Sequence, residues 1–166
     1  MVLVCFGGNS CIGGNNRLKP KPVAGYSGTP LIKKLGIKSE FKAAFVNAPE
    51  QFVQQLELPA NVQVQTVSKS KELDFILFFV KSRAALQTAF AQYAGKIKAN
   101  GMIWISWPKK TSGVQTDVTE NIVRDIGLVA GLVDVKICAI DEVWSGLKFV
   151  YRLKDRPPAG VARQIE

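Results

Sequence analysis

Runs of apolar residues alternate with segments of helical periodicity through the middle of the chain. Two of these runs, Leu73–Val80 and Met102–Trp107, are almost continuously apolar, which is typical of parallel strands buried on both faces. Val62–Val67 alternates strictly between apolar and polar residues, as a half-buried or edge strand does. The other runs predicted as strands are Phe41–Asn47, Val133–Ile140 and Leu147–Leu153.

The helices are predicted between these strands from periodicity and capping residues. Ser82–Lys98 has apolar residues at helical spacing, its first serine as N-cap and Asn100-Gly101 as the stop. The second long helix is predicted over Asp117–Leu132, with Thr116 or Asp117 as N-cap. Shorter helical segments are expected at Leu31–Leu35 and Glu50–Glu57.

Alternation of strands and helices predicts an α/β fold with three layers: a mostly parallel sheet of about six strands between helices. The last two strands should form a hairpin, so the final strand is antiparallel. We expect the spatial order second, first, third, fourth, sixth, fifth, with only the sixth strand antiparallel. The folded unit is predicted as one domain over residues 25–154. Glycine, asparagine and proline predict a flexible leader over 1–24 and a flexible C-terminal tail over 155–166.

Composition removes several classes of chemistry. The 166 residues include no histidine, which excludes Ser-His-Asp and Cys-His catalysis and every zinc site that needs histidine. Cys5 and Cys11 lie in the glycine-rich leader without a second ligand pair, and Cys138 lies in an apolar run, so no metal site is predicted. The apolar start is too short for a signal peptide and no run could span a membrane, so the default location is cytoplasmic.

The net charge of +9 favours anionic partners. Ligands of open parallel sheets bind at the carboxyl ends of the strands, predicted here at 47–50, 68–71, 81–83 and 108–112. These segments and their flanks are expected to make that edge basic, because lysine and arginine outnumber acids there. The residues are Lys69, Lys71, Lys81, Arg83, Lys109 and Lys110, against Glu50 and Glu72.

An anion site is predicted where the loops after the third and fourth strands converge. Lysine supplies a point charge for phosphate, and glycine allows close approach of backbone amides. The spacing of a P-loop is missing, and ordinary solvated loop lysines are the alternative. The candidate ligand-binding residues are Lys109, Lys110, Ser112 and Gly113, with Lys81 or Arg83.

Several segments resemble the signature of an uncharacterised bacterial family of unknown function. They are Tyr26-Ser27-Gly28-Thr29-Pro30-Leu31, Lys33-Lys34-Leu35-Gly36-Ile37-Lys38, Trp107-Pro108-Lys109-Lys110, Ser112-Gly113-Val114, Thr116-Asp117 and Trp144-Ser145-Gly146-Leu147-Lys148-Phe149. This resemblance covers residues 25–152 and implies a small bacterial cytoplasmic protein. It implies no reaction.

The order of elements over about residues 40–153 is similar to the Rossmann-like core of class I methyltransferases, which also ends in an antiparallel hairpin. That resemblance implies a glycine-rich loop after the first strand and an acid after the second, which holds ribose hydroxyls. Asn47-Ala48-Pro49-Glu50 has no glycine, and Val67-Ser68-Lys69 is basic. Both departures predict weak or absent binding of S-adenosylmethionine.

The function predicted first is a non-enzymatic domain that binds a nucleotide-like or phosphorylated anion at the basic carboxyl edge of the sheet. The alternative is a degenerate or atypical S-adenosylmethionine-dependent methyltransferase. A second alternative is a nucleic-acid or protein interaction module, although no RNP-type or helix-turn-helix motif is present. The sequence names no cofactor, no ligand and no oligomeric state.

Overall fold

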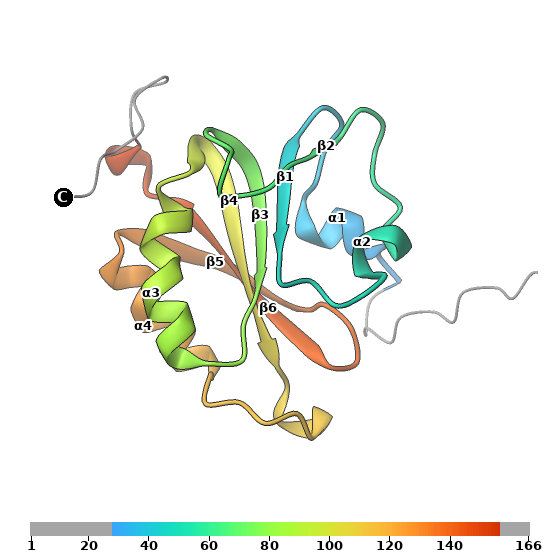
Figure 1. Cartoon of the computed structure of the whole chain (residues 1–166). Coiled ribbons are helices and arrows are strands. Elements are labelled where there is room, and N and C mark those ends of the chain that lie inside the picture. Colours follow the sequence, from blue (N-terminus) through green and yellow to red (C-terminus); the bar gives the residue numbers. More distant parts are fainter. Residues whose placement is uncertain (1–27, 157–166) are drawn as a thin grey trace, which may run out of the picture.

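A computed structural model describes residues 28–156, so the predicted leader 1–24 lies outside the described residues. Helices cover both faces of a central six-stranded sheet (Figure 1). None of the helices in residues 28–156 is long and apolar enough to cross a membrane. The strands are β1 (Lys42–Val46), β2 (Gln63–Val64), β3 (Leu73–Phe79), β4 (Ile97–Pro108), β5 (Leu132–Ala139) and β6 (Trp144–Tyr151); the helices are α1 (Leu31–Leu35), α2 (Phe52–Gln55), α3 (Arg83–Ala94) and α4 (Glu120–Val129), with 3₁₀ turns at Lys110–Ser112 and Leu153–Asp155.

The strand order is β2-β1-β3-β4-β6-β5, and β6 runs antiparallel to both of its neighbours. The predicted fold class, strand order and antiparallel final strand are therefore confirmed. The chain moves from β1 outward to β2 and then returns to place β3 on the other side of β1. The strand order thus reverses between β1 and β3, which is where open α/β sheets form their binding crevice.

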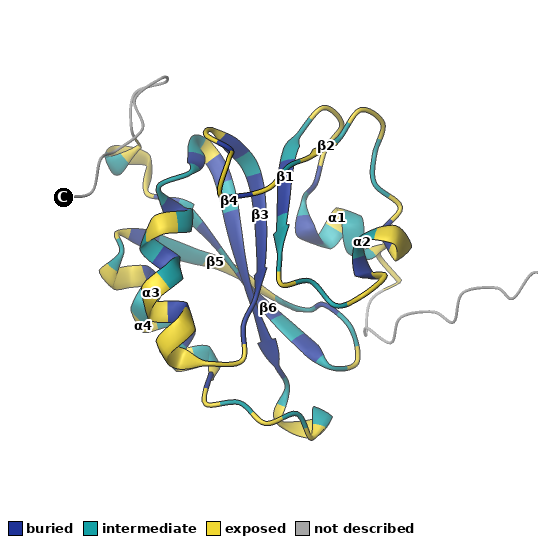
Figure 2. Cartoon of the chain, viewed as in Figure 1, coloured by how far each residue is buried: buried dark blue, intermediate teal, exposed yellow. Residues whose placement is uncertain are grey.

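Two hydrophobic cores lie on opposite faces of the sheet, and the buried residues follow the central strands (Figure 2). On the face of α3 and α4, the rings of Phe90 and Phe149 meet edge to face at 5.4 Å. On the face of α1 and α2, Trp104 is fully buried and its indole Nε1–H donates to the carbonyl of Leu35 at 3.0 Å. That bond attaches the short helix α1 to the middle of the sheet.

The boundary between α3 and β4 differs from the predicted one. Helix α3 ends at Ala94, and β4 already begins at Ile97. An irregularity in the β3–β4 pairing accommodates the extra residues, and a Cβ on Gly101 would lie 2.8 Å from the carbonyl of Leu73. Gly101 is therefore required by the close approach of β3 and is not a helix stop.

The start of α4 was also predicted too early. Thr119 is its N-cap, and the Thr119 hydroxyl accepts from Ile122 N–H at 3.5 Å. Thr116 instead donates its hydroxyl to the carbonyl of Lys81 at 2.7 Å, and the carboxylate of Asp117 accepts from Arg83 N–H at 2.7 Å. These two side chains tie the β4–α4 loop to the beginning of α3.

The hairpin strands also start earlier than predicted, since β6 begins at Trp144 rather than at Leu147. The carboxylate of Asp141 accepts from the backbone N–H of Val143 and of Trp144, both at 2.7 Å. This local turn shortens the connection, so the chain re-enters the sheet within a few residues.

Replacing Gly127 by alanine is expected to lower the free energy of unfolding by about 1–3 kcal/mol, because overpacking displaces core side chains. A Cβ there would lie 2.1 Å from Cε1 of the fully buried Phe149 ring. Urea unfolding measures the loss. Gly28→Ala is the matched control, since nothing lies within 4 Å of its Cβ position. Equal stability of Gly127→Ala and the parent would contradict this packing.

Candidate functional site

The carboxyl ends of β1 and β3 lie side by side where the strand order reverses. Val46 pairs with Phe78 in the register of these parallel strands. Asn47, the next residue, donates its side-chain N–H to the carbonyl of Phe79 at 3.5 Å. Residues 47–51 and 80–82, termed the reversal loops below, therefore lie side by side at the carboxyl edge of the sheet.

The first reversal loop has a backbone conformation usual for glycine although it contains none. Asn47 has φ 52° and Gln51 has φ 65°, both in the left-handed region. Asparagine tolerates that region better than most residues, and a left-handed glutamine stores strain of a kind found at binding sites. The loop thus lacks the glycines that class I methyltransferases have after the first strand. At Asn47 and Gln51 it nevertheless has positive φ angles of the kind that glycine adopts.

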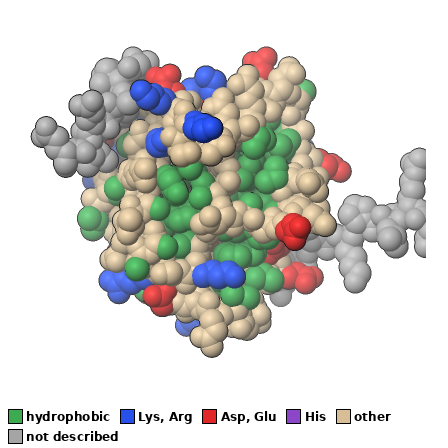
Figure 3. All heavy atoms as spheres, in the orientation of Figure 1, with side chains coloured by type: hydrophobic (Ala, Val, Ile, Leu, Met, Phe, Trp, Pro, Cys, Tyr) green, Lys and Arg blue, Asp and Glu red, His purple; other side chains and the backbone are tan. Residues whose placement is uncertain are grey.

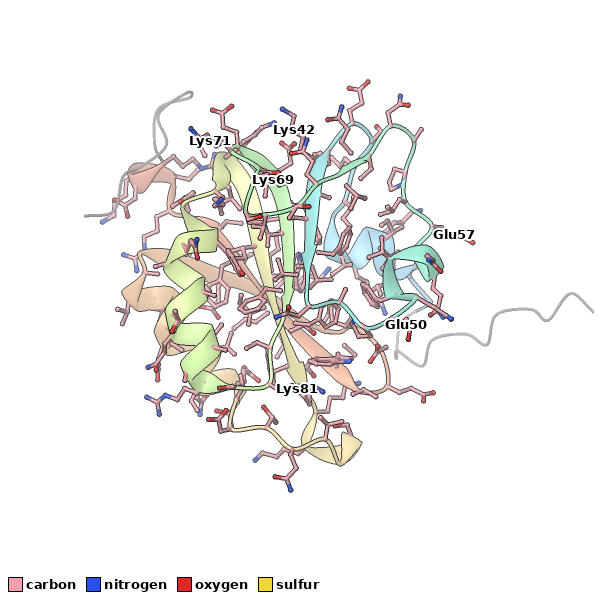
Figure 4. The ribbon with its side chains drawn as sticks, in the orientation of Figure 1. Lys42, Glu50, Glu57, Lys69, Lys71 and Lys81 are labelled. Carbon is pink, nitrogen blue, oxygen red and sulfur yellow. The ribbon has the colours of Figure 1, made fainter. Side chains whose placement is uncertain are left out.

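A row of aromatic rings crosses the carboxyl edge next to this loop. The ring of Phe79 contacts Phe52 on one side and Trp144 on the other, each edge to face at 5.0 Å. The ammonium of Lys81 lies 5.9 Å from the centre of the Trp144 ring (Figure 4). The row joins α2, β3 and β6, and its polar end is the lysine of the second reversal loop.

Ser106 lies under the aromatic row and was not singled out from the sequence. It is fully buried on β4, opposite Phe79 on β3 and Gly146 on β6. Within residues 28–156, its hydroxyl has no hydrogen-bond partner. A buried hydroxyl in this condition costs free energy unless another molecule satisfies it. No sequence pattern signals it, because a single serine in a buried strand looks like any small residue.

A cavity of about 210 Å³ opens beside the aromatic row, between α1, α2 and the β5–β6 turn. Its apolar wall includes Leu31, Phe52 and Ile140, and its polar groups include Gln55 and Glu57. Its size suits part of a small molecule and not a large one. Nowhere in the described part of the chain do three potential metal ligands gather.

The predicted anion-site residues mostly stabilise their own loop. The ammonium of Lys109 donates to the carbonyl of Asp141 at 2.6 Å, which fastens the loop to the β5–β6 turn. The hydroxyl of Ser112 donates to the carbonyl of Lys109 at 2.6 Å and accepts from Val114 N–H at 3.3 Å. Gly113 ends this turn at φ 72°.

The remaining predicted residues lie near that loop and make contacts of their own. Lys110 is exposed, Lys81 lies against Trp144, and the N–H of Arg83 is bound by Asp117. The structure therefore places these side chains along the same edge without giving them a common target.

The prediction that Lys69 and Lys71 lie at this edge is wrong. Strand β2 has only two residues, which pair with Lys42 and Ala43 at the start of β1. The chain then turns back to begin β3, so Lys69 and Lys71 lie near Lys42 at the opposite edge (Figure 4). For the same reason, no residue directly after β2 can occupy the position expected for a ribose-binding acid.

The carboxyl edge is consequently balanced in charge and not basic. Lysine and arginine side chains appear at both ends of the sheet on the face shown in Figure 3. The cations that remain at the carboxyl edge are equalled in number by acids of the same loops. The cations are Lys81, Arg83, Lys109 and Lys110, and the acids are Glu50, Asp117, Asp141 and Glu142.

Comparisons with known proteins identify the fold. No family model and no curated protein matches the chain. The fibrillarin pre-rRNA processing protein of Methanococcus jannaschii is similar with a TM-score of 0.50 at 12% identity, over 75% of this chain and 70% of that one. A SAM-dependent methyltransferase of Aquifex aeolicus has a TM-score of 0.49 at 12% identity, over 72% and 86%. The magnesium protoporphyrin IX methyltransferase of Synechocystis has 0.49 at 9%, over 74% of each chain.

These results correct the function predicted first from the sequence. The likeness to solved structures at low sequence identity shows the fold alone, a Rossmann-like α/β core. The edge proposed to attract an anion has balanced charge. A non-enzymatic anion-binding domain at that edge is therefore overturned.

Proposed function

We propose that this chain is an atypical S-adenosylmethionine-dependent methyltransferase that binds its methyl donor between the reversal loops. The observation that carries the proposal is the reversal of strand order between β1 and β3, where Asn47 and Gln51 have left-handed backbone. A change between right- and left-handed backbone can turn neighbouring amide N–H groups toward one point, where they bind a ligand.

The groups beside the reversal loops suit the chemistry of the donor. The aromatic row is largely buried, and the outer edge of Trp144 at its end is the part offered to an adenine or a sulfonium cation. Glu57 in the neighbouring cavity supplies negative charge for the sulfonium, and Lys81 supplies positive charge for a carboxylate. When bound, the donor supplies an electrophilic methyl group. The chain's own contribution is to hold and orient it beside a dry aromatic surface.

Binding is expected to be weak. The two-residue β2 leaves the ribose without an acid after the second strand. We expect a dissociation constant on the order of 0.1 mM, equivalent to about 5–6 kcal/mol of binding free energy. This value agrees with the weak binding that the sequence predicts.

Isothermal titration with S-adenosylhomocysteine, the demethylated product, tests the proposal. Asn47→Arg should abolish binding, because a long side chain would occupy the space beside the reversal loops that the proposal gives to the ligand. Asn61→Arg is the matched control, since Asn61 is also exposed and left-handed, with φ 60°, but lies next to β2 at the opposite edge. No binding by the parent at millimolar ligand, or equal binding by both variants, would overturn the proposal.

Residues 25–154 are proposed to form the single domain that carries this site. The resemblance to the uncharacterised bacterial family adds the proposal that the protein is bacterial and cytoplasmic. Neither proposal changes the geometry of the reversal loops, residues 47–51 and 80–82.

A further inference from the structure

Two lysines face each other directly across the β5–β6 pair. Lys136 and Lys148 are cross-strand partners in its register. Like charges in that arrangement destabilise a sheet, whereas opposite charges stabilise it. A local conflict of this kind commonly marks a functional position.

A bulge in β5 creates this pairing. The register shifts between Asp134 and Lys136. Before the shift, Asp134 faces α4 and its carboxylate accepts from Arg124 Nε–H at 3.0 Å. After it, Lys136 faces α1 and its ammonium donates to the carbonyl of Lys34 at 3.2 Å. Without the extra residue, Lys136 would share the α4 face with Asp134, because side chains alternate along a strand.

Lys148 lies partly buried between the sheet and the end of α1. It pairs with Trp104 of β4, and its ammonium lies 3.9 Å from the Cβ position of Gly36, which ends α1 with φ 79°. The ion pairs found in residues 28–156 join Lys98 with Asp74 and Arg124 with two acids. The ammonium of Lys148 makes no hydrogen bond or ion pair within that part of the chain.

The charged groups around Lys148 are all cationic. Burial lowers the pKa of Lys148, and the nearby charges of Lys136 and Lys38 lower it further. On β5, burial raises the pKa of the Cys138 thiol, while Lys136 and Lys34 act in the opposite direction. Four lysines from α1, the loop that follows it, β5 and β6 thus converge here and are termed the lysine cluster: Lys34, Lys38, Lys136 and Lys148.

We propose that the lysine cluster is a binding site for a phosphoryl group. A phosphoryl dianion placed between Lys136 and Lys148 would convert their repulsion into two charge-assisted contacts. Lys38 lies close enough to add long-range attraction, as its effect on Lys148 indicates. The site lies on the α1 face of the β5–β6 hairpin, away from the reversal loops, and is independent of the proposed methyl-donor site.

Thermal unfolding with added inorganic phosphate tests the site, with sodium chloride at equal ionic strength as reference. The melting temperature of the parent should rise with the logarithm of phosphate concentration once this exceeds the dissociation constant, expected at roughly 1–10 mM for a small anion at a surface site. Lys148→Met should weaken this response about tenfold or more. Lys71→Met, an exposed lysine at the amino edge, should respond like the parent. An unchanged response in Lys148→Met, or none in the parent, would overturn the proposal.

Adenosine diphosphate in place of phosphate distinguishes the source of the phosphoryl group. A larger rise in melting temperature for the nucleotide than for phosphate at equal concentration assigns a phosphate ester as ligand, and an equal rise assigns the free oxyanion. In both cases, the loss in Lys148→Met is required.

The pH dependence of the unliganded protein gives a second readout. Because the folded-state pKa of Lys148 is lowered, its destabilising effect is fully present below that pKa and disappears as pH rises toward the ordinary value of 10.5. Lys148→Met should therefore melt at a higher temperature than the parent near pH 7, with the difference shrinking toward pH 10.5. A difference that does not change with pH would contradict the proposed charge repulsion.

Discussion

Trp104→Ala is expected to lower the free energy of unfolding by about 3–5 kcal/mol, the usual cost of removing a buried tryptophan. Trp104 is fully buried in the centre of the sheet, and its indole N–H binds the carbonyl of Leu35. Helix α1 has only five residues, too few to be stable without tertiary contacts. Unfolding of α1 would also remove one wall of the 210 Å³ cavity. Urea unfolding measures the cost.

Trp104→Phe separates packing from hydrogen bonding. It keeps an aromatic ring but leaves the carbonyl of Leu35 without its donor, which costs about 1–3 kcal/mol for a buried group. Limited trypsin digestion should then cleave faster after Lys33 and Lys34 of α1. A loss below about 1 kcal/mol in Trp104→Ala would contradict the packing described here.

Ser106→Ala is expected to raise the free energy of unfolding by about 1–3 kcal/mol, because it removes a buried hydroxyl without a partner. Few core substitutions stabilise a protein, so the sign of the effect is informative. Ser145→Ala on the neighbouring strand is the control, since Ser145 is partly exposed and should change stability by no more than about 0.5 kcal/mol. Thermal and urea unfolding both measure the difference.

A second measurement on Ser106→Ala connects stability with function. If the hydroxyl serves the proposed ligand, the variant should be more stable and should bind S-adenosylhomocysteine more weakly. Destabilisation of the variant without ligand would show that the hydroxyl already has a partner, and the assignment of Ser106 to the site would fail.

The sheet could be predicted because strands that are buried on both faces are apolar at nearly every position. Leu73–Val80 and Met102–Trp107 are apolar at all but one position each, which predicted their place at the centre of the sheet. The closing hairpin followed from two strands separated by the turn at Asp141. The position of a strand in the sheet depends on how many of its faces are buried, and the hairpin depends on a local turn. Both leave a pattern in neighbouring residues of the sequence.

The end of β2 could not be predicted, because a distant residue determines it. Val62–Val67 alternates like a longer strand, but only Gln63–Val64 pairs with β1. The ammonium of Lys96 binds the carbonyls of Val67 and Ser68 at 2.7 and 3.0 Å and holds the chain in a turn. The two residues joined by this contact are 29 positions apart in the sequence. Because the sequence pattern does not reveal the contact, the prediction placed the lysines after β2 at the wrong edge of the sheet.

The candidate site escaped prediction for a related reason. The sequence shows that the loop after β1 has no glycine. It does not show the backbone conformation of that loop, which depends on the residues that the loop packs against. Asn47 is left-handed while it bridges to Phe79 of another strand. Ser106 becomes significant only because β3 and β6 cover it on both sides. Charge counted along the sequence likewise does not say at which edge a lysine will lie.

The central claim is that a methyl donor binds between the reversal loops, and amide chemical-shift mapping tests it most directly. S-adenosylhomocysteine added to ¹⁵N-labelled protein should shift the amides of residues 47, 48, 50, 51 and 80–82, and the indole N–H of Trp144. The amides of Lys136 and Lys148 should not move. Shifts absent from the reversal loops at millimolar ligand, or confined to other parts of the sheet, would contradict the claim.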